Sequence, residues 1–178
     1  MSREQVAVKS RAICKQVLSS AEYKDAETIF AYYPLGNEVD CLPVLKAALN
    51  TGKRVFLPRT GQDCQMDFYE IHSLDDVEEG NFHVMEPKAS CKQFVPDRKT
   101  EKNGQNILVL VPGVVFDYQG NRYGYGKGYY DHYFARFPWL KRMALAYTEQ
   151  MSMNLLECLE TDEKMHIIVT EKEIISVD

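Results

Sequence analysis

Hydrophobic and polar positions along the chain follow two alternating periods, one typical of helices and one typical of strands. Helical periodicity covers residues 6–20, 42–50 and 129–137. Strand-like runs rich in β-branched and aromatic residues cover residues 28–33, 54–57, 66–71, 107–111, 142–147 and 166–170. The order of these segments predicts an α/β fold, a three-layer sandwich in which a mostly parallel, mixed central sheet carries helices on both faces.

The strongest strand signal is the apolar run Ile-Leu-Val-Leu-Val at residues 107–111. A continuous run of this kind indicates burial on both faces, as in the middle of a parallel sheet. Pro34 and Pro58 are expected to end two other strands, and Gly52 is expected to end a helix. Ligands of such sheets bind where loops leave the carboxyl ends of the strands, so the loops after residues 33, 57 and 111 are the expected site.

The segment 75–104 has a different character from the rest of the chain. It is polar and is interrupted by Gly80, Pro87 and Pro96. Because glycine and proline break regular elements, we expect this segment to wrap the surface with short elements only.

Composition and charge then narrow the class of protein. With 178 residues, of which 45% are hydrophobic and 26% charged, residues 1–178 are expected to form a single domain. The net charge of −5 argues against a general nucleic-acid binder, which needs a basic face. No apolar run is long enough to cross a membrane and the first residues lack a signal peptide's apolar stretch, so we expect a cytoplasmic protein.

Cysteine and histidine spacing gives no metal or disulfide pattern. The five cysteines form no Cys-x-x-Cys pair, and we interpret them as reduced, mostly buried thiols. The four histidines have no ligand spacing and are interpreted as structural or surface residues.

The most informative stretch is a glycine-rich loop between the central strand and a helix. Gly124, Gly126 and Gly128 allow the backbone to bring its amides close to a ligand, and Arg122 and Lys127 add positive charge. The pattern is neither a Walker A loop nor Gly-x-Gly-x-x-Gly. It favours a cradle for polyphosphate over the alternative, a surface turn without a ligand.

Asp131 lies at the start of the helix that follows this loop. An acidic residue there complements the helix dipole, which is the commoner reason for one. Beside a bound triphosphate it would also suit Mg²⁺, which takes one or two carboxylates together with phosphate oxygens.

Two runs in this region, Pro112-Gly113-x-x-Phe116-Asp117 and Gly120-Asn-Arg-x-Gly-x-Gly-Lys-Gly-Tyr-Tyr-Asp131, resemble the signature of 5-formyltetrahydrofolate cyclo-ligases, also called methenyltetrahydrofolate synthetases. Further pieces match in order, and the resemblance covers roughly residues 10–175. These pieces are Tyr33-Pro34-x-x-x-Glu38-Val39-Asp40, Leu57-Pro58-Arg59, Met66-Asp67-Phe68, Phe82 through Glu86-Pro87, and Asp162 ahead of residues 167–171.

This resemblance implies an ATP- and Mg²⁺-dependent enzyme that acts on 5-formyltetrahydrofolate. In the family's reaction the formyl oxygen attacks the γ-phosphate, N10 closes the ring, and the products are 5,10-methenyltetrahydrofolate, ADP and phosphate. Positioning and electrostatics supply most of the rate in such transfers, and no protein nucleophile is needed. The resemblance also implies a monomer with no membrane or nucleic-acid partner.

The resemblance implies a role for each matching residue. Lys127, Arg122 and Tyr129 are the expected catalytic residues, with both cations on the phosphates, and Asp131 and Asp162 are the expected magnesium ligands. The expected ATP and folate contacts are Arg122, Tyr123, Gly124, Tyr125, Gly126, Lys127, Gly128, Tyr129, Tyr130, Tyr33, Glu38, Arg59, Met66 and Phe82. Among them Glu38 would hydrogen-bond the pterin, because a carboxylate accepts two bonds from an amino-pyrimidinone edge.

Six of these residues also have a plainer interpretation. Glu38 and Asp162 suit solvated positions, Tyr33 and Met66 suit the core, Phe82 suits a loop anchor, and Arg59 suits a surface ion pair.

Three positions depart from the family pattern. Members usually begin with a basic helix of the form Lys-x-x-x-Arg, whereas Lys9 and Arg11 here align with the turns that follow it. Tyr125 stands where the family often has arginine, and His166 stands where it often has aspartate. Two other hypotheses therefore stay open: a folate- or nucleotide-binding homologue with weak or no turnover, and an ATP-using enzyme with another substrate.

Overall fold

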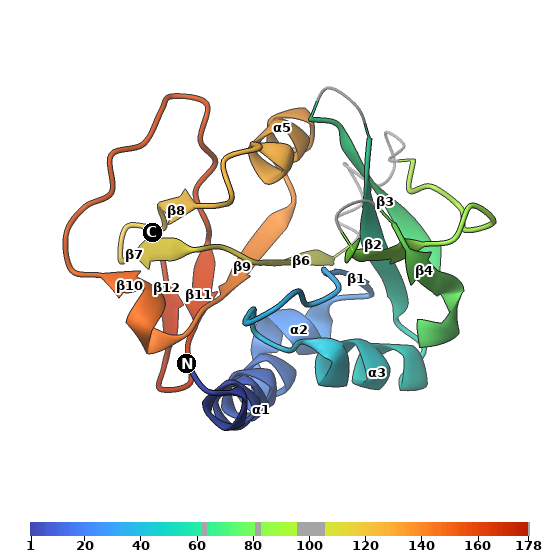
Figure 1. Ribbon diagram of the computed structural model, residues 1–178, viewed down its shortest axis with the longest axis horizontal. Coiled ribbons are helices and arrows are strands. Elements are labelled where there is room, and N and C mark those ends of the chain that lie inside the picture. Colours follow the sequence, from blue (N-terminus) through green and yellow to red (C-terminus); the bar gives the residue numbers. More distant parts are fainter. Residues whose placement is uncertain (62–63, 81–82, 96–105, 178) are drawn as a thin grey trace.

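The computed structural model describes residues 1–61, 64–80, 83–95 and 106–177 (Figure 1). Its helices are α1 (Arg3–Ser19), α2 (Ala21–Asp25), α3 (Leu42–Asn50) and α5 (Tyr129–Arg136), with 3-10 turns at Leu74–Asp76 and Thr148–Gln150. Its strands are β1 (Thr28–Phe30), β2 (Arg54–Thr60), β3 (Met66–Ile71), β4 (Val77–Glu79), β5 (Met85–Pro87), β6 (Ile107–Val111), β7 (Val115–Asp117), β8 (Arg122–Tyr123), β9 (Lys141–Leu145), β10 (Met151–Ser152), β11 (Ile167–Val169) and β12 (Ile174–Ser176).

A seven-stranded sheet in the order β12-β11-β9-β6-β1-β2-β3 forms the middle layer. The strands from β11 to β2 are parallel, and the two edge strands, β12 and β3, pair antiparallel with their neighbours. In Figure 1, α1, α2 and α3 cover one face of this sheet and α5 covers the other. The predicted α/β sandwich with a mostly parallel, mixed sheet is confirmed.

The apolar core is divided by the sheet into two clusters, and β6 belongs to both. Leu108 and Leu110 pack with α1 and α3, whereas Val109 and Val111 pack with α5. Every residue of β6 is buried, which confirms burial of this strand on both faces. The central position of β6 brings the loop after Val111 to the middle of the sheet's carboxyl edge.

Local sequence explains where α1 begins and where α3 ends. Ser2 and Gln5 form a reciprocal capping box at the start of α1, which satisfies two amides that the helix itself leaves free. After α3, Gly52 has a φ of +77°, the left-handed conformation that commonly follows a helix. The predicted stop at Gly52 is confirmed.

Two predicted strand ends differ from the structure. β1 ends at Phe30, before Pro34, and β2 continues through Pro58 to Thr60. Pairing of β2 with β1 covers only residues 54–56, so the missing amide hydrogen of Pro58 lies beyond that ladder, while Pro58 still pairs with Phe68 of the edge strand β3. This continuation carries Thr60 over the carboxyl edge of the sheet.

Several small elements were not predicted. β7, β8 and β10 form a separate three-stranded sheet, and β12 adds an edge strand. The described part of residues 75–104 contains a 3-10 turn, β4 and β5, consistent with short elements only, while Pro96 lies outside the described residues. No helix in the described ranges has the length and apolar character needed to cross a membrane.

All five cysteines are free thiols. Cys14 and Cys41 are buried, Cys64 and Cys91 are partly exposed, and Cys158 is exposed, so burial is less general than predicted.

Candidate active site

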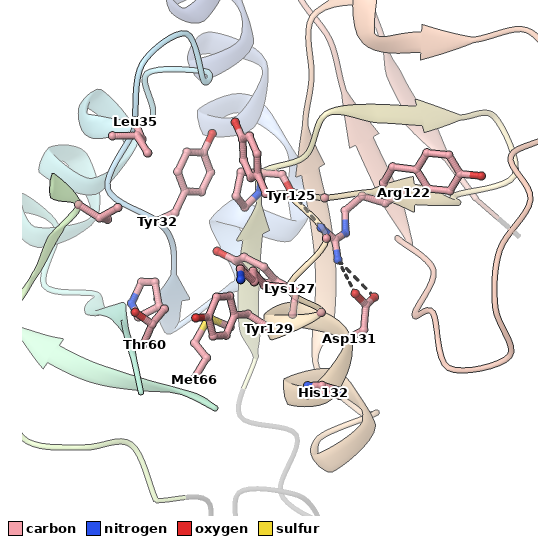
Figure 2. Close-up of a pocket in the computed structure, with 18 of the residues that line it drawn as sticks. Tyr32, Leu35, Thr60, Met66, Arg122, Tyr125, Lys127, Tyr129, Asp131 and His132 are labelled. Carbon is pink, nitrogen blue, oxygen red and sulfur yellow. Dashed lines mark hydrogen bonds and ion pairs between the residues drawn. The ribbon is translucent and has the colours of Figure 1, made fainter. Parts of the chain in front are cut away.

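A cavity of about 860 Å³ lies at the carboxyl edge of the parallel strands (Figure 2). Five segments that are distant in sequence line it, and their lining residues fall within residues 32–38, 58–66, 84–86, 122–132 and 159–162, with Pro112 from the end of β6. Its volume is in the range of about 300–1,000 Å³ that is typical of ligand pockets. The loops that the sequence indicated after residues 33, 57 and 111 therefore meet at one site.

The glycine-rich loop forms the longest stretch of the cavity wall. Gly126 has a φ of +80°, and Gly128, the residue that caps the start of α5, has a φ of +65°. Both values lie in the left-handed region that side chains other than glycine rarely adopt. Within the described part of the chain, the amides of residues 124–128 donate to no acceptor. These amides and the first turn of α5 are the groups expected at an anion-binding site.

Arg122 and Asp131 form an ion pair across the base of this loop (Figure 2). The distances from Nη2 of Arg122 to the two carboxylate oxygens are 3.0 and 3.2 Å. The arginine side chain is 5% exposed, and its guanidinium lies 5.5 Å from the ring centre of Tyr130. The sequence assigned Arg122 to phosphate and Asp131 to magnesium, whereas the structure pairs them with each other.

Gly124 leaves room for that guanidinium. A β-carbon at this position would lie 2.7 Å from Nη1 of Arg122, closer than real contacts allow. Gly124 is therefore required for packing, whereas Gly126 and Gly128 are required for their backbone conformation.

Lys127 is the loop cation whose charge is not paired with any residue that the structure describes. Its side chain is exposed and lines the cavity, and it forms no ion pair with any residue that the structure describes. With Arg122 neutralised by Asp131, Lys127 and the main-chain amides supply the positive potential of the wall.

Glu38 projects from the loop after β1 into the same cavity. Its Oε2 accepts a hydrogen bond of 2.9 Å from the amide of Leu35, and its carbonyl oxygen accepts one of 3.1 Å from the Tyr147 hydroxyl. Burial raises the pKa of the Glu38 carboxyl, and the Leu35 amide and the Tyr125 hydroxyl partly offset this effect. The interpretation of Glu38 as a fully solvated loop residue is not supported.

Apolar and aromatic side chains form the remaining wall. Tyr33, Met66 and Tyr129 all line the cavity, and Tyr129 lies beside Met66 in Figure 2. Met66 is 3% exposed and also belongs to the core cluster on the α5 face, so the core and wall interpretations both apply to it. Phe82 lies outside the described residues.

Arg59 is not brought to the cavity. Its guanidinium donates to the carbonyl oxygens of Pro87 and Lys88 and lies 4.1 Å from the ring centre of Tyr69. Arg59 therefore stabilises the connection between β2 and β5, and its contact with phosphate or folate stays a prediction.

Asp162 lines the cavity near the end of its wall, and its Oδ2 accepts the amide of Leu159 at 2.8 Å. The described residues contain no cluster of three or more histidine, cysteine or acidic side chains that would hold a metal alone. Two carboxylates suit Mg²⁺ only when phosphate oxygens and water complete its shell. Asp131 and Asp162 both line the cavity, and their role as magnesium ligands stays a prediction.

Two further cavity residues were not singled out by the sequence. The Glu86 side chain is buried, and its Oε1 accepts hydrogen bonds from the amide and the hydroxyl of Thr60 at 3.0 and 2.8 Å. Glu86 lies in a Glu-Pro pair that matched the family pattern, and this match could have indicated Glu86 as a cavity residue. No sequence pattern indicated Thr60, because this residue reaches the cavity only when β2 continues past Pro58.

The other departures from the family pattern lie away from the cavity. Lys9 pairs with Glu149 and Glu171 at 2.5 and 2.6 Å, and it does not line the cavity. Nδ1 of His166 accepts the amide of Arg142 at 3.0 Å. Burial and the nearby Arg142 lower the pKa of His166 to about 4, so its ring is neutral at physiological pH, and the interpretation of this histidine as structural is supported.

Comparisons with known proteins identify similar sequences and a similar fold. The model of the 5-formyltetrahydrofolate cyclo-ligase family matches residues 1–171. The 5-formyltetrahydrofolate cyclo-ligase of Mus musculus is 30% identical over 85% of this chain and 77% of its own length. The structure of Aquifex aeolicus 5,10-methenyltetrahydrofolate synthetase superposes with a TM-score of 0.83 and 28% identity, covering 99% of this chain and 85% of that chain.

A synthetase structure from Mycoplasma pneumoniae shares the fold at a TM-score of 0.72 and 21% identity, over 96% of this chain and 90% of that one. The family model covers nearly the whole described fold, including the glycine-rich loop and the loop that carries Glu38. The chain belongs to the 5-formyltetrahydrofolate cyclo-ligase family.

Proposed function

We propose that the protein catalyses the ATP-dependent conversion of 5-formyltetrahydrofolate to 5,10-methenyltetrahydrofolate, with release of ADP and phosphate. One observation carries the proposal: an anion-binding loop, a partly buried carboxylate and an aromatic wall line the same cavity of about 860 Å³. The mouse and Aquifex relatives bear names for this activity.

The loop end of the cavity suits the triphosphate of ATP. The amides of residues 124–128 are directed to no acceptor in the described chain, and α5 begins directly after them. Lys127 adds a full positive charge. Groups fixed before the reaction stabilise developing charge at little cost in reorganisation, so this wall is suited to phosphoryl transfer.

Other side chains of the same cavity suit a reduced pteridine. Glu38 offers a carboxylate to the amino-pyrimidinone edge, and Tyr33, Met66 and Tyr129 offer flat or flexible apolar surface to the ring. Substrate held there would present its formyl oxygen toward the loop, and the protein would need only to align the two reactants.

Asp131 and Asp162 would hold Mg²⁺, which would neutralise part of the phosphate charge when bound. The pairing of Asp131 with Arg122 orients this carboxylate at the cavity edge.

The test is the absorbance of the methenyl product with purified protein, 5-formyltetrahydrofolate and Mg-ATP. We expect product formation that requires all three components. If no ATP-dependent product forms at any enzyme concentration, catalysis is rejected. Calorimetric binding of the folate without phosphate release would then select the binding homologue. Stabilisation by ATP with no response to folates would select another substrate.

A further inference from the structure

The main chain of the loop after β1 is attached to two other elements by buried hydroxyl groups. The hydroxyl of Tyr147, which follows β9, donates to the carbonyl oxygen of Glu38 at 3.1 Å. The amide of Asp40 donates to the hydroxyl oxygen of Ser10, on α1, at 3.0 Å. These two hydroxyl oxygens lie 3.0 Å apart, and both side chains belong to residues that are 2% exposed. One buried chain of hydrogen bonds therefore joins α1 and the end of β9 to this loop.

The number of available protons fixes the direction of each hydrogen bond in this chain. The carbonyl oxygen of Glu38 can only accept, so the single proton of the Tyr147 hydroxyl points to it. Tyr147 must then accept from Ser10, whose oxygen in turn accepts from the amide of Asp40. Each hydroxyl thus donates once and accepts once. A buried polar chain that is paired in this way favours one arrangement of the loop.

The direction of the Glu38 carboxylate depends on that arrangement. The carboxylate accepts from the amide of Leu35 at 2.9 Å, and the amide of Glu38 donates to the carbonyl oxygen of Leu35 at 3.1 Å. Both contacts lie within one turn of the loop, so they fix the shape of the turn and not its place relative to the cavity. The Tyr147 hydroxyl attaches this turn to the rest of the fold, at the carbonyl of Glu38 itself.

We infer that Tyr147 is a positioning residue: its hydroxyl, oriented by Ser10, holds the main chain at Glu38 so that the carboxylate of Glu38 projects into the main cavity. This inference rests on the proposed function, in which Glu38 receives the pteridine. Neither Tyr147 nor Ser10 lines the main cavity. The inference therefore gives α1 and the residue after β9 a part in folate binding without contact with the ligand.

A second tyrosine supports the same loop in a different way. The Tyr32 hydroxyl donates to the carbonyl oxygen of Val39 at 2.8 Å. Tyr32 also lines the main cavity, so a substitution there would change the ligand's surroundings as well as the loop. Tyr147 is therefore the residue at which the position of the loop is tested without a change to the cavity wall.

The experiment measures binding of 5-formyltetrahydrofolate by calorimetry, without nucleotide, for wild type and Y147F. We expect Y147F to bind the folate about 2- to 10-fold more weakly, the equivalent of one net hydrogen bond, with an unchanged affinity for ADP. In an E38A background, Y147F should have no further effect on folate binding. Y23F is the matched control, because the Tyr23 hydroxyl is also buried, has no hydrogen-bond partner among the described residues, and lies outside the cavity lining.

A second measurement needs no ligand and adds S10A as a further variant. Amide hydrogen exchange followed by NMR reports opening of the loop at Leu35 and Asp40. In Y147F both amides should exchange about 2- to 10-fold faster, beyond any change shared by the amides of β6, which report global unfolding. S10A should accelerate exchange at Leu35 as well, because Tyr147 then loses the group that orients its hydroxyl.

Unchanged folate affinity in Y147F, equal losses for folate and ADP, or a loss that persists in the E38A background would overturn the positioning role. Unchanged exchange of the Leu35 amide in Y147F would overturn it too. Failure of wild type to bind any folate would instead refute the proposed function, and the exchange rates would still decide whether Tyr147 holds the loop.

Discussion

The guanidinium of Arg122 and the carboxylate of Asp131, nine positions apart in the chain, lie 3.0 Å from each other and tie together the two ends of the glycine-rich loop. Asp131 also accepts the amide of Glu163 at 3.1 Å, so the same carboxylate attaches the loop to the segment that carries Asp162. The pair thus fixes the shape of the glycine-rich wall without placing a free charge on it.

Replacing either partner of this pair should destabilise the protein, because an uncompensated charge would remain in a largely buried position. R122A and D131N are each expected to lower the free energy of unfolding by about 3 kcal/mol, and the double variant by less than their sum. Denaturant unfolding measures all three values. D67N, which breaks the more exposed pair with Arg136, should cost less than about 1 kcal/mol. Additive losses would show that the two side chains act independently.

G126A should weaken nucleotide binding while leaving the core intact. Its φ of +80° is strained for alanine, but no atom lies within 4 Å of the added β-carbon, so the cost is conformational, about 1 kcal/mol. G52A has the same type of strain at a φ of +77° far from the cavity and is the matched control. We expect G126A and G52A to lower the free energy of unfolding equally. Only G126A should lower the affinity for ADP. Equal ADP affinities would remove the loop from the binding site.

K127A should lower both turnover and ATP affinity, since the available cation of the loop is lost. Electrostatic groups of this kind contribute about 2.7–4 kcal/mol to the transition state, or roughly 100- to 1,000-fold in turnover. Steady-state kinetics with varied ATP measure the effect. K46A removes an exposed lysine from α3, on the other face of the sheet, and should have no effect. Normal turnover of K127A would disprove its phosphate role.

His166 should make stability depend on pH in a defined window. Burial, and then repulsion by Arg142, lower its pKa from 6.5 to about 4, so the unfolded chain binds a proton that the folded chain does not. Stability is therefore complete above pH 6.5 and declines as the pH falls toward about 4. H166N should flatten this part of the curve, measured by denaturant unfolding at a series of pH values. An unchanged slope in H166N would show that another group causes this pH dependence.

The sequence predicted the parts of the fold that leave a long or contiguous signal. The run at 107–111 reveals β6 because both of its faces are buried, and Gly52 reveals the end of α3 because only the backbone conformation matters there. β8 and β10 are two residues long and β7 and β12 three, too short to show a period. Their existence depends on tertiary pairing that a local pattern does not contain.

The candidate site likewise has residues that a contiguous motif predicts and residues that only the tertiary structure brings together. The glycine-rich loop and Glu38 were found because each lies in a contiguous motif. Arg122 and Asp131 lie in one motif as well, but we predicted a separate ligand for each of them, and only the folded loop brings them together. Arg59 and Thr60 are neighbours at the end of β2, yet only Thr60 faces the cavity, because successive residues of a strand point to opposite sides.

Helix α5 is eight residues long, and its two turns serve both the cavity and the core. Tyr129 faces the cavity, whereas Tyr133 and Phe134 are buried against the sheet, where Tyr133 packs on Phe68 at 4.9 Å between ring centres. A helix of two turns is too short for one turn to line the cavity while another packs independently in the core. Evolution toward a different ligand is therefore expected to proceed through the loops at residues 34–38 and 159–162, since any change that repacks the helix would also re-aim the amides at its start.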